Sequence, residues 1–224
     1  VSYEEAAMLE PMAVAVHAIR KVLFCTVRGT KKIVICGLGT IGLLLFMFLW
    51  DIKQQNSQDG IQILVIGNKE FQKRMAVQLG LPEASFCDSR TENAEQWLSE
   101  RTGGRGADVF FECVGKNETV SEAILATAPA GKIQLVGNPA SDMNFDQNTY
   151  WKILRNQLTV RGNWNSTFLH SAEDDWHYVL NLLRKGKIHP EHYITQRFRL
   201  DELEKGLHIM KDKTEEYVKV MITL

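Results

Sequence analysis

Cysteine is scarce in this sequence, and no two cysteines form a Cys-x-x-Cys pair. This absence excludes a zinc knuckle and a dithiol redox motif. The four cysteines are Cys25, Cys36, Cys87 and Cys113. Because Cys36 and Cys113 lie within apolar, strand-like runs, we expect them to be reduced core residues. Reduced core thiols are typical of a cytoplasmic protein rather than a secreted one.

Long hydrophobic runs and an excess of one charge are also absent. The most apolar stretch, Ile33–Trp50, contains three glycines. It therefore predicts a strand, a turn and a buried helix rather than a membrane span of about 20 apolar residues. The formal net charge of -1 gives no attraction to nucleic acid or to an acidic membrane. The opening residues, Val1–Glu5, have no basic region and no initiator methionine, so we expect no signal peptide and a chain that begins partway through a longer protein.

The clearest motif is a glycine turn between a strand and a helix. Ile33–Cys36 is typical of a buried strand, and it leads into Gly37-Leu38-Gly39-Thr40-Ile41-Gly42. In such a G-x-G-x-x-G turn the first glycine permits the tight turn and the second lets the backbone approach a pyrophosphate. The third lets the helix lie close to the strand. Since a helix N-terminus attracts phosphate, the motif favours a dinucleotide site over a simple strand–turn–helix corner.

Strands and helices alternate from this turn to about Trp164. Further strands are predicted at Ile61–Ile66, Ala84–Cys87, Ala107–Glu112, Gly131–Gly137 and Gln157–Gly162. Helices are predicted at Thr40–Lys53, Glu70–Leu79, Thr91–Arg101, Glu118–Ala128 and Thr149–Arg155. The alternation predicts an α/β fold with a doubly wound parallel sheet of about six strands. Because ligands bind at the carboxyl ends of such strands, we expect one rim to hold Gly37, Gly67, Val114, Gly115, Gly137 and Asn138.

The two flanks of this unit do not follow the alternation. Ser2–Val22 predicts a helix that Ser2 and Glu5 cap, with a break near Glu10–Pro11 because proline crowds the preceding turn. After Trp164 we predict a helix, an extended segment, a second helix and a terminal strand, at Ala172–Lys185, Glu191–Phe198, Glu202–Lys211 and Tyr217–Leu224. We therefore divide the chain into residues 1–16, 17–164 and 165–224.

The end of the second strand bears on the choice of cofactor. NAD-binding proteins place an Asp or Glu there for the ribose hydroxyls, whereas this strand ends in Gly67-Asn68-Lys69. Gly67 leaves space, Asn68 can donate a hydrogen bond, and Lys69 and Arg74 can neutralise a 2′-phosphate. We therefore predict NADP, with NAD as the second choice. The alternative is that Lys69 is a solvated residue at a helix start, although a cation there opposes the helix dipole and favours a bound anion.

Other reactive side chains have simpler interpretations. Glu112-Cys113 has no neighbouring histidine, which argues against a nucleophile with its base. His170, His177, His189 and His192 lack a metal-binding spacing and are expected to be solvated. Glu10 stands in the apolar context Met8–Met12. It is either a surface residue at a helix end or a buried carboxylate that needs a partner such as a metal.

Together these residues resemble the medium-chain zinc-dependent alcohol and polyol dehydrogenase family. Glu4–Ala18 resembles the family's hinge between its two domains, and Gly37–Leu44 resembles its pyrophosphate loop. Phe111–Gly115 and Leu135–Gly137 resemble its later strand ends, near the nicotinamide. Lys152–Asn165 is most similar to galactitol-1-phosphate 5-dehydrogenases and sorbitol dehydrogenase-like members.

The resemblance implies a Rossmann cofactor domain and an oxidation of a secondary alcohol of a sugar alcohol, or of its phosphate. Zinc would polarise the alcohol while a hydride passes to NADP or NAD. Glu10 would ligate that zinc directly or through water, and Lys219 would approach the pyrophosphate, although Val218 stands where the family has glycine. The candidate cofactor-binding residues are therefore Gly37, Leu38, Gly39, Thr40, Ile41, Gly42, Gly67, Asn68, Lys69, Arg74, Val114, Gly115, Val136, Gly137, Asn138 and Lys219.

The family's N-terminal GroES-like catalytic domain has no counterpart in this chain. That domain supplies the Cys and His ligands of the zinc, and a single glutamate cannot replace them because catalytic zinc takes three protein ligands. We therefore expect no catalytic residue here, and a return of residues 165–224 to the absent domain. The family also predicts a homodimer through Gln157–Trp164, or a homotetramer, without nucleic-acid or membrane partners.

Two alternatives differ in class from this dehydrogenase. The first is a non-catalytic NADP(H)-binding module, against which the absent initiator methionine argues. The second is a relative of the zinc-independent quinone reductases, against which Glu10-Pro11 argues.

Overall fold

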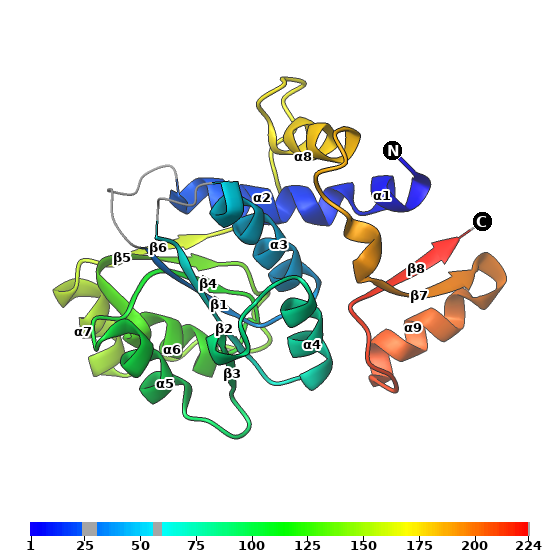
Figure 1. Cartoon of the computed structure of the whole chain (residues 1–224). Coiled ribbons are helices and arrows are strands. Elements are labelled where there is room, and N and C mark those ends of the chain that lie inside the picture. Colours follow the sequence, from blue (N-terminus) through cyan, green and yellow to red (C-terminus); the bar gives the residue numbers. More distant parts are fainter. Residues whose placement is uncertain (24–30, 56–59, 224) are drawn as a thin grey trace.

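The structure, a computed structural model, describes residues 1–23, 31–55 and 60–223. Its centre is a six-stranded sheet with the strand order β3-β2-β1-β4-β5-β6, and all its neighbours are parallel (Figure 1). The strands are β1 (Lys32–Cys36), β2 (Gln62–Gly67), β3 (Phe86–Asp88), β4 (Ala107–Glu112), β5 (Thr127–Leu135) and β6 (Thr159–Gly162). The predicted doubly wound α/β sheet is confirmed, and its order reverses between β1 and β4.

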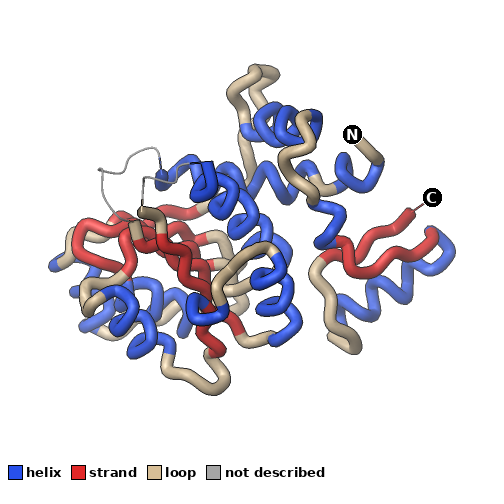
Figure 2. The backbone as a smooth tube through the Cα atoms, viewed as in Figure 1, coloured by secondary structure: helices blue, strands red, loops and turns tan. Residues whose placement is uncertain are grey.

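Helices cover both faces of this sheet (Figure 2). They are α3 (Thr40–Gln55), α4 (Glu70–Gln78), α5 (Ala94–Thr102), α6 (Asn117–Ala126) and α7 (Gln147–Arg155). Along β1 the side chains alternate between two apolar clusters. Ile33 and Ile35 belong to the cluster that holds the apolar side of α3, whereas Val34 and Cys36 belong to the cluster of α5 and α6. A strand buried on both faces has an unbroken apolar sequence.

The chain opens with two helices, α1 (Tyr3–Ala7) and α2 (Leu9–Leu23). The capping box is confirmed, because Glu5 N donates to Ser2 Oγ and Ser2 N donates to the Glu5 carboxylate. The break lies at Met8 rather than at Glu10–Pro11. Pro11 falls in the first turn of α2, where the missing N–H has no intrahelical partner to lose.

The C-terminal part divides between two places (Figure 1). The helix α8 (Asp175–Arg184) packs on α2, whereas β7 (Ile194–Arg199), α9 (Leu203–Asp212) and β8 (Lys219–Thr223) form a small unit beside α1. β7 and β8 are parallel. Short 3-10 helices lie at η1 (Glu83–Ser85), η2 (Pro190–Tyr193) and η3 (Leu200–Glu202). The predicted succession of helix, extended segment, helix and strand is confirmed within the described residues.

A buried aspartate joins α8 to the N-terminal helix α2. Asp175 is 1% exposed and accepts hydrogen bonds from His17 Nδ1 at 2.7 Å and Arg20 Nη1 at 3.1 Å. It also accepts bonds from the N–H and the hydroxyl of Thr167. The boundary predicted between residues 16 and 17 lies inside α2, and the division into domains stays a prediction.

Several element ends differ from the expectation. β5 begins at Thr127 rather than Gly131 because Thr127 pairs with Ala107 of β4. α5 begins at Ala94 rather than Thr91, since Asn93 caps its N-terminus by accepting from Gln96 N. Within the described ranges, Cys36 and Cys87 are buried, Cys113 is half-buried and all three are free, whereas Cys25 lies outside these ranges. No helix in the same ranges combines the length and the apolar character needed to cross a bilayer.

Candidate dinucleotide-binding site

The glycine turn has a conformation that requires its first and third glycines. Gly37 has φ +92 and donates its N–H to Ile66 O of β2 at 2.8 Å, so the turn is tight and left-handed at this residue. A Cβ at Gly42 would lie 1.9 Å from Gly37 O. The first turn of α3 therefore packs directly on the loop.

The second glycine stands beside open space. A Cβ at Gly39 would meet no atom within 4 Å, and Gly39 itself is exposed. Leu38 is 1% exposed, so its side chain belongs to the core, while Thr40 and Ile41 are half-buried at the start of α3. The N–H groups of a first helical turn lack intrahelical acceptors. An open space at such a turn fits the pyrophosphate of a dinucleotide.

The turns after β4 and β5 meet the glycine turn on the same rim. A Cβ at Gly37 would lie 2.6 Å from Val114 Cγ2, and a Cβ at Gly115 would lie 1.8 Å from Asn138 O. A Cβ at Gly137 would lie 2.2 Å from Gly115 N. Glu112, at the end of β4, accepts hydrogen bonds from both turns. The structure therefore brings these predicted residues together where the strand order reverses.

The end of β2 carries the residues predicted to select the cofactor. Asn68 and Lys69 are exposed, and Lys69 stands at the N-cap of α4 without a side-chain capping bond. Gly67 lies against β3, since a Cβ there would be 3.0 Å from the Phe86 ring. Gly67 O accepts a hydrogen bond from Ser89 N. This end of the sheet thus presents an unpaired amide side chain and a cation to solvent.

Arg74 has an exposed partner in the C-terminal part. Its Nη2 lies 3.6 Å from Glu216 Oε2 of the C-terminal part, and both side chains are more than half exposed. Arg90 follows β3, and its Nε lies 2.9 Å from Asp88 Oδ1. Hydrogen bonds from Arg90 lower the pKa of Asp88 to about 2. The sequence pattern did not predict this pair.

The C-terminal strand β8 begins beside the glycine turn. The Thr40 hydroxyl donates to Val218 O at 2.5 Å. Lys219, the next residue, is half-buried, and its carbonyl accepts a hydrogen bond from the Thr195 hydroxyl. The backbone at Lys219 is therefore adjacent to the start of α3, which fits the predicted approach to the pyrophosphate.

The predicted metal ligand stands alone. Glu10 is exposed in the first turn of α2. In the part of the chain that the structure describes, no group of three or more His, Cys, Asp and Glu residues is arranged to hold a metal ion. Since catalytic zinc takes three protein ligands, these residues do not fit a complete zinc site.

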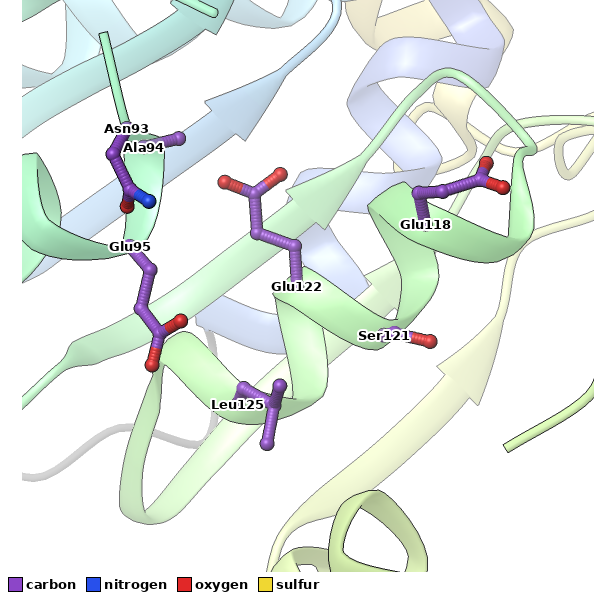
Figure 3. A pocket seen from close by; sticks show the side chains of 7 residues that line it. All are labelled: Asn93, Ala94, Glu95, Glu118, Ser121, Glu122 and Leu125. Atoms are coloured by element: carbon purple, nitrogen blue, oxygen red, sulfur yellow. The ribbon is translucent and has the colours of Figure 1, made fainter. Parts of the chain in front are cut away.

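A separate pocket of about 300 Å³ lies between α5 and α6 (Figure 3). It is lined by Asn93, Ala94, Glu95, Glu118, Ser121, Glu122 and Leu125. Glu122 projects from α6 into this pocket, and its Oε1 is buried without a hydrogen-bond partner. Burial, and next the charge of Glu95, raise the pKa of Glu122 to about 7.

A glycine turn that opens a helix at the switch point of a parallel sheet of this order defines a Rossmann-type fold. The sequence identifies the family more closely. A model of the zinc-binding dehydrogenase family matches residues 57–185. The chain belongs to that family.

Two similar proteins are a sorbitol dehydrogenase and a butanediol dehydrogenase. The chain is 28% identical to a sorbitol dehydrogenase from Halalkalibacterium halodurans over 97% of its own length and 58% of the relative's. It is 29% identical to an (R,R)-butanediol dehydrogenase from Bacillus subtilis over 99% of its length and 58% of the relative's. The chain therefore spans little more than half the length of these proteins.

A solved structure confirms the fold. The galactitol-1-phosphate dehydrogenase of Escherichia coli matches 96% of this chain and 59% of its own, with a TM-score of 0.77 and 24% identity. At this identity the match supports the fold alone.

Proposed function

We propose that this chain is the cofactor-binding part of a zinc-dependent dehydrogenase that uses NADP or NAD to oxidise a secondary alcohol of a sugar alcohol or sugar-alcohol phosphate. The observation that carries the proposal is the meeting of three turns at the switch point, around the open space at Gly39. The names of the sorbitol and butanediol dehydrogenases support the class of substrate.

Different parts of the rim bind different parts of the dinucleotide. When bound, the nicotinamide takes up or gives a hydride. The start of α3 binds the pyrophosphate, the end of β2 binds the adenosine ribose, and the turns after β4 and β5 bind the nicotinamide half. Lys219 contributes at the pyrophosphate, because the carbonyl of the preceding residue, Val218, accepts a hydrogen bond from the Thr40 hydroxyl.

NADP is the preferred cofactor in this proposal. The end of β2 offers no carboxylate at Gly67-Asn68-Lys69, and Lys69 is an exposed cation without a capping bond. A 2′-phosphate at this place would gain a charge-assisted contact. NAD remains the second choice, with Asn68 serving the ribose.

Zinc and the chemical step belong to the remainder of the protein. Glu10 supplies at most one ligand, directly or through water, and the described residues offer no further cluster. Residues 1–16 and 165–224 adjoin that remainder. Two observations support this: Arg197 of β7 pairs with Glu4 of α1, and α9 exposes Leu203, Leu207 and Met210. We expect the chain to bind cofactor but to lack dehydrogenase activity by itself.

The edge strand β6 supports a homodimer. β6 is exposed throughout and ends the sheet, and an unpaired edge favours pairing with another strand. We therefore propose that residues Gln157–Trp164 join two copies across a two-fold axis, with a tetramer as a further step. The free thiols of Cys36, Cys87 and Cys113 support a cytoplasmic location.

Calorimetric titration of the chain with NADPH and NADH, side by side, tests the proposed function. Tighter binding of NADPH is the expected result. Tighter binding of NADH would overturn the cofactor preference while leaving the dinucleotide site in place. Binding of neither would contradict the proposal that the chain carries the cofactor site.

A further inference from the structure

Glu112 is a buried carboxylate to which the sequence pattern assigns no role. It is 1% exposed at the end of β4. Its Oε1 accepts hydrogen bonds from Val114 N at 2.9 Å, from Gly115 N at 2.8 Å and from the Thr119 hydroxyl at 2.8 Å. Bonds to an ionised acceptor are about twice as strong as neutral ones. One oxygen atom thus anchors the turn after β4 and the first turn of α6.

The backbone of the same residue holds the neighbouring turn. Glu112 O accepts hydrogen bonds from Val136 N at 2.8 Å and from Gly137 N at 3.0 Å. The two turns are in direct contact, because no Cβ fits at Gly115 or Gly137. A further hydrogen bond, from Ala140 N to Gly115 O at 2.9 Å, joins the same two turns, so Glu112 is one of the residues that set their spacing.

These turns form one half of the proposed site. A dinucleotide crosses such a sheet at the switch point, with one mononucleotide over each half. The end of β2 lies on the β1–β3 half, whereas the turns after β4 and β5 lie on the other half. A Cβ at Gly37 would lie 2.6 Å from Val114 Cγ2, so the turn after β4 begins beside the glycine turn.

We propose that Glu112 is a positioning residue for the nicotinamide half of the dinucleotide. Its carboxylate fixes the turn at 113–116 and the first turn of α6, its backbone carbonyl holds the turn at 136–138, and the cofactor binds to the pair. Glu112 is buried and therefore acts through these turns rather than by touching the cofactor. The inference rests on the proposed dinucleotide-binding function.

Two ligands separate this role from a general effect on folding. NADH spans both halves of the site, whereas ADP fills the adenosine and pyrophosphate part. In Glu112→Ala we expect the Kd for NADH to rise about 10-fold or more and the Kd for ADP to change less than about twofold. Glu112→Gln keeps an oxygen acceptor for the same three donors and should restore most of the affinity for NADH.

A milder variant covers the case in which Glu112→Ala does not fold. Thr119→Val removes one of the three donors and should raise the Kd for NADH about threefold, with ADP unaffected. Ser121→Ala, on the same helix, is the matched control and should change neither constant. Melting temperatures are recorded for every variant.

The outcomes distinguish the role of Glu112 from the proposed dinucleotide-binding function. Equal losses for NADH and ADP, or unchanged NADH binding in folded Glu112→Ala and Thr119→Val, overturn the role of Glu112 alone. If the unsubstituted chain binds neither ligand, the proposed function is overturned, and this inference is overturned with it.

Discussion

The hydroxyl of Thr40 donates a hydrogen bond to the carbonyl oxygen of Val218, 178 positions further along the chain. Val218 N in turn donates to the Thr195 hydroxyl at 3.0 Å. The first turn of α3 is thereby fastened to the start of β8, and through Thr195 to β7. The C-terminal part is thus in direct contact with the helix that would receive the pyrophosphate.

Thr40→Val tests whether this contact stabilises the fold. Valine keeps the shape of the side chain but cannot donate to Val218 O, so we expect the free energy of unfolding to fall by about 1 kcal/mol. Urea denaturation followed by circular dichroism gives this value. Thr40→Ser retains the hydroxyl and serves as the control. A Thr40→Val chain as stable as the Thr40→Ser chain would show that the bond contributes nothing.

An alanine substitution should weaken cofactor binding at Gly39 and lower the stability of the fold at Gly42. A Cβ at Gly42 would collide with Gly37 O at 1.9 Å, so Gly42→Ala should lower the free energy of unfolding by more than about 2 kcal/mol. Gly39 faces open space, so Gly39→Ala should fold normally and weaken NADH binding by about 10-fold, because the methyl group occupies the place of the pyrophosphate. Thermal melts and calorimetry measure the two effects. Normal NADH binding in Gly39→Ala would contradict the proposed pyrophosphate-binding position.

Alanine variants of Lys69 and Arg74 together test the preference for NADPH over NADH. Lys69→Ala should lose about 1–3 kcal/mol of NADPH affinity, the range of a charge-assisted contact, and change NADH affinity little. Arg74→Ala should change both much less, because the structure places Arg74 beside Glu216. Calorimetric titration of both variants with both cofactors gives the four constants. A larger effect from Arg74 than from Lys69 would show that the assignment is reversed.

Glu122 should make the stability of the chain depend on pH. The pKa of its carboxyl is about 7 in the folded protein, against 4.5 ordinarily. The folded state therefore holds a proton that the unfolded state releases between these values, and the free energy of unfolding rises as the pH falls from 8 to 5. Since Glu122 is only partly buried, the gain should be roughly 1–2 kcal/mol.

Glu122→Gln isolates this contribution. The variant should be more stable than the unsubstituted chain at pH 8 and approach it at pH 5, because the amide carries no charge at either pH. Glu118→Gln changes an exposed glutamate at the same pocket and should leave the pH dependence intact. Urea denaturation at both values provides the comparison. Parallel pH profiles for Glu122→Gln and the unsubstituted chain would refute the assignment.

Trp164 and Val160 should control the assembly of two copies. Trp164 is 76% exposed and Val160 is 39% exposed at the edge strand. Burial of such side chains between copies contributes about 1.5–3 kcal/mol each, so Trp164→Ala and Val160→Lys should each raise the dimer dissociation constant about 10-fold or more. Light scattering across a concentration series measures this constant. A monomer at micromolar concentration before any substitution would contradict the proposed dimer.

The local pattern of the sequence was sufficient for most of the sheet. Ile33–Cys36 and the glycines after it predicted a buried strand and a turn, because both features depend on residues close in sequence. The break lies at Met8, ahead of the one expected near Glu10–Pro11, since a proline fits in the first turn of a helix. Thr127 extended β5 because pairing with Ala107, rather than propensity, decided where the strand begins.

The sequence pattern did not predict which groups the charged side chains contact. Arg74 was predicted to neutralise a 2′-phosphate together with Lys69, but the pattern did not predict its partner Glu216, which is far away in the sequence. Asp175 binds His17 and Arg20 across more than 150 positions. Glu112 was considered beside Cys113 as a reactive pair, although the donors to its carboxylate are Val114, Gly115 and Thr119. Contacts of this kind depend on the folded geometry, which spacing alone does not specify.

The strand order has a consequence for how the chain assembles. β1 pairs with β2, which follows soon after it, and with β4, which is made only after β2 and β3. Nearby pairings form faster than distant ones, so during synthesis β1, β2 and β3 can come together while one edge of β1 still waits for its partner. The crevice proposed for the dinucleotide thus lies at the pairing whose two strands are separated by the longest stretch of chain in this sheet. A bound cofactor would hold together the two halves that meet there.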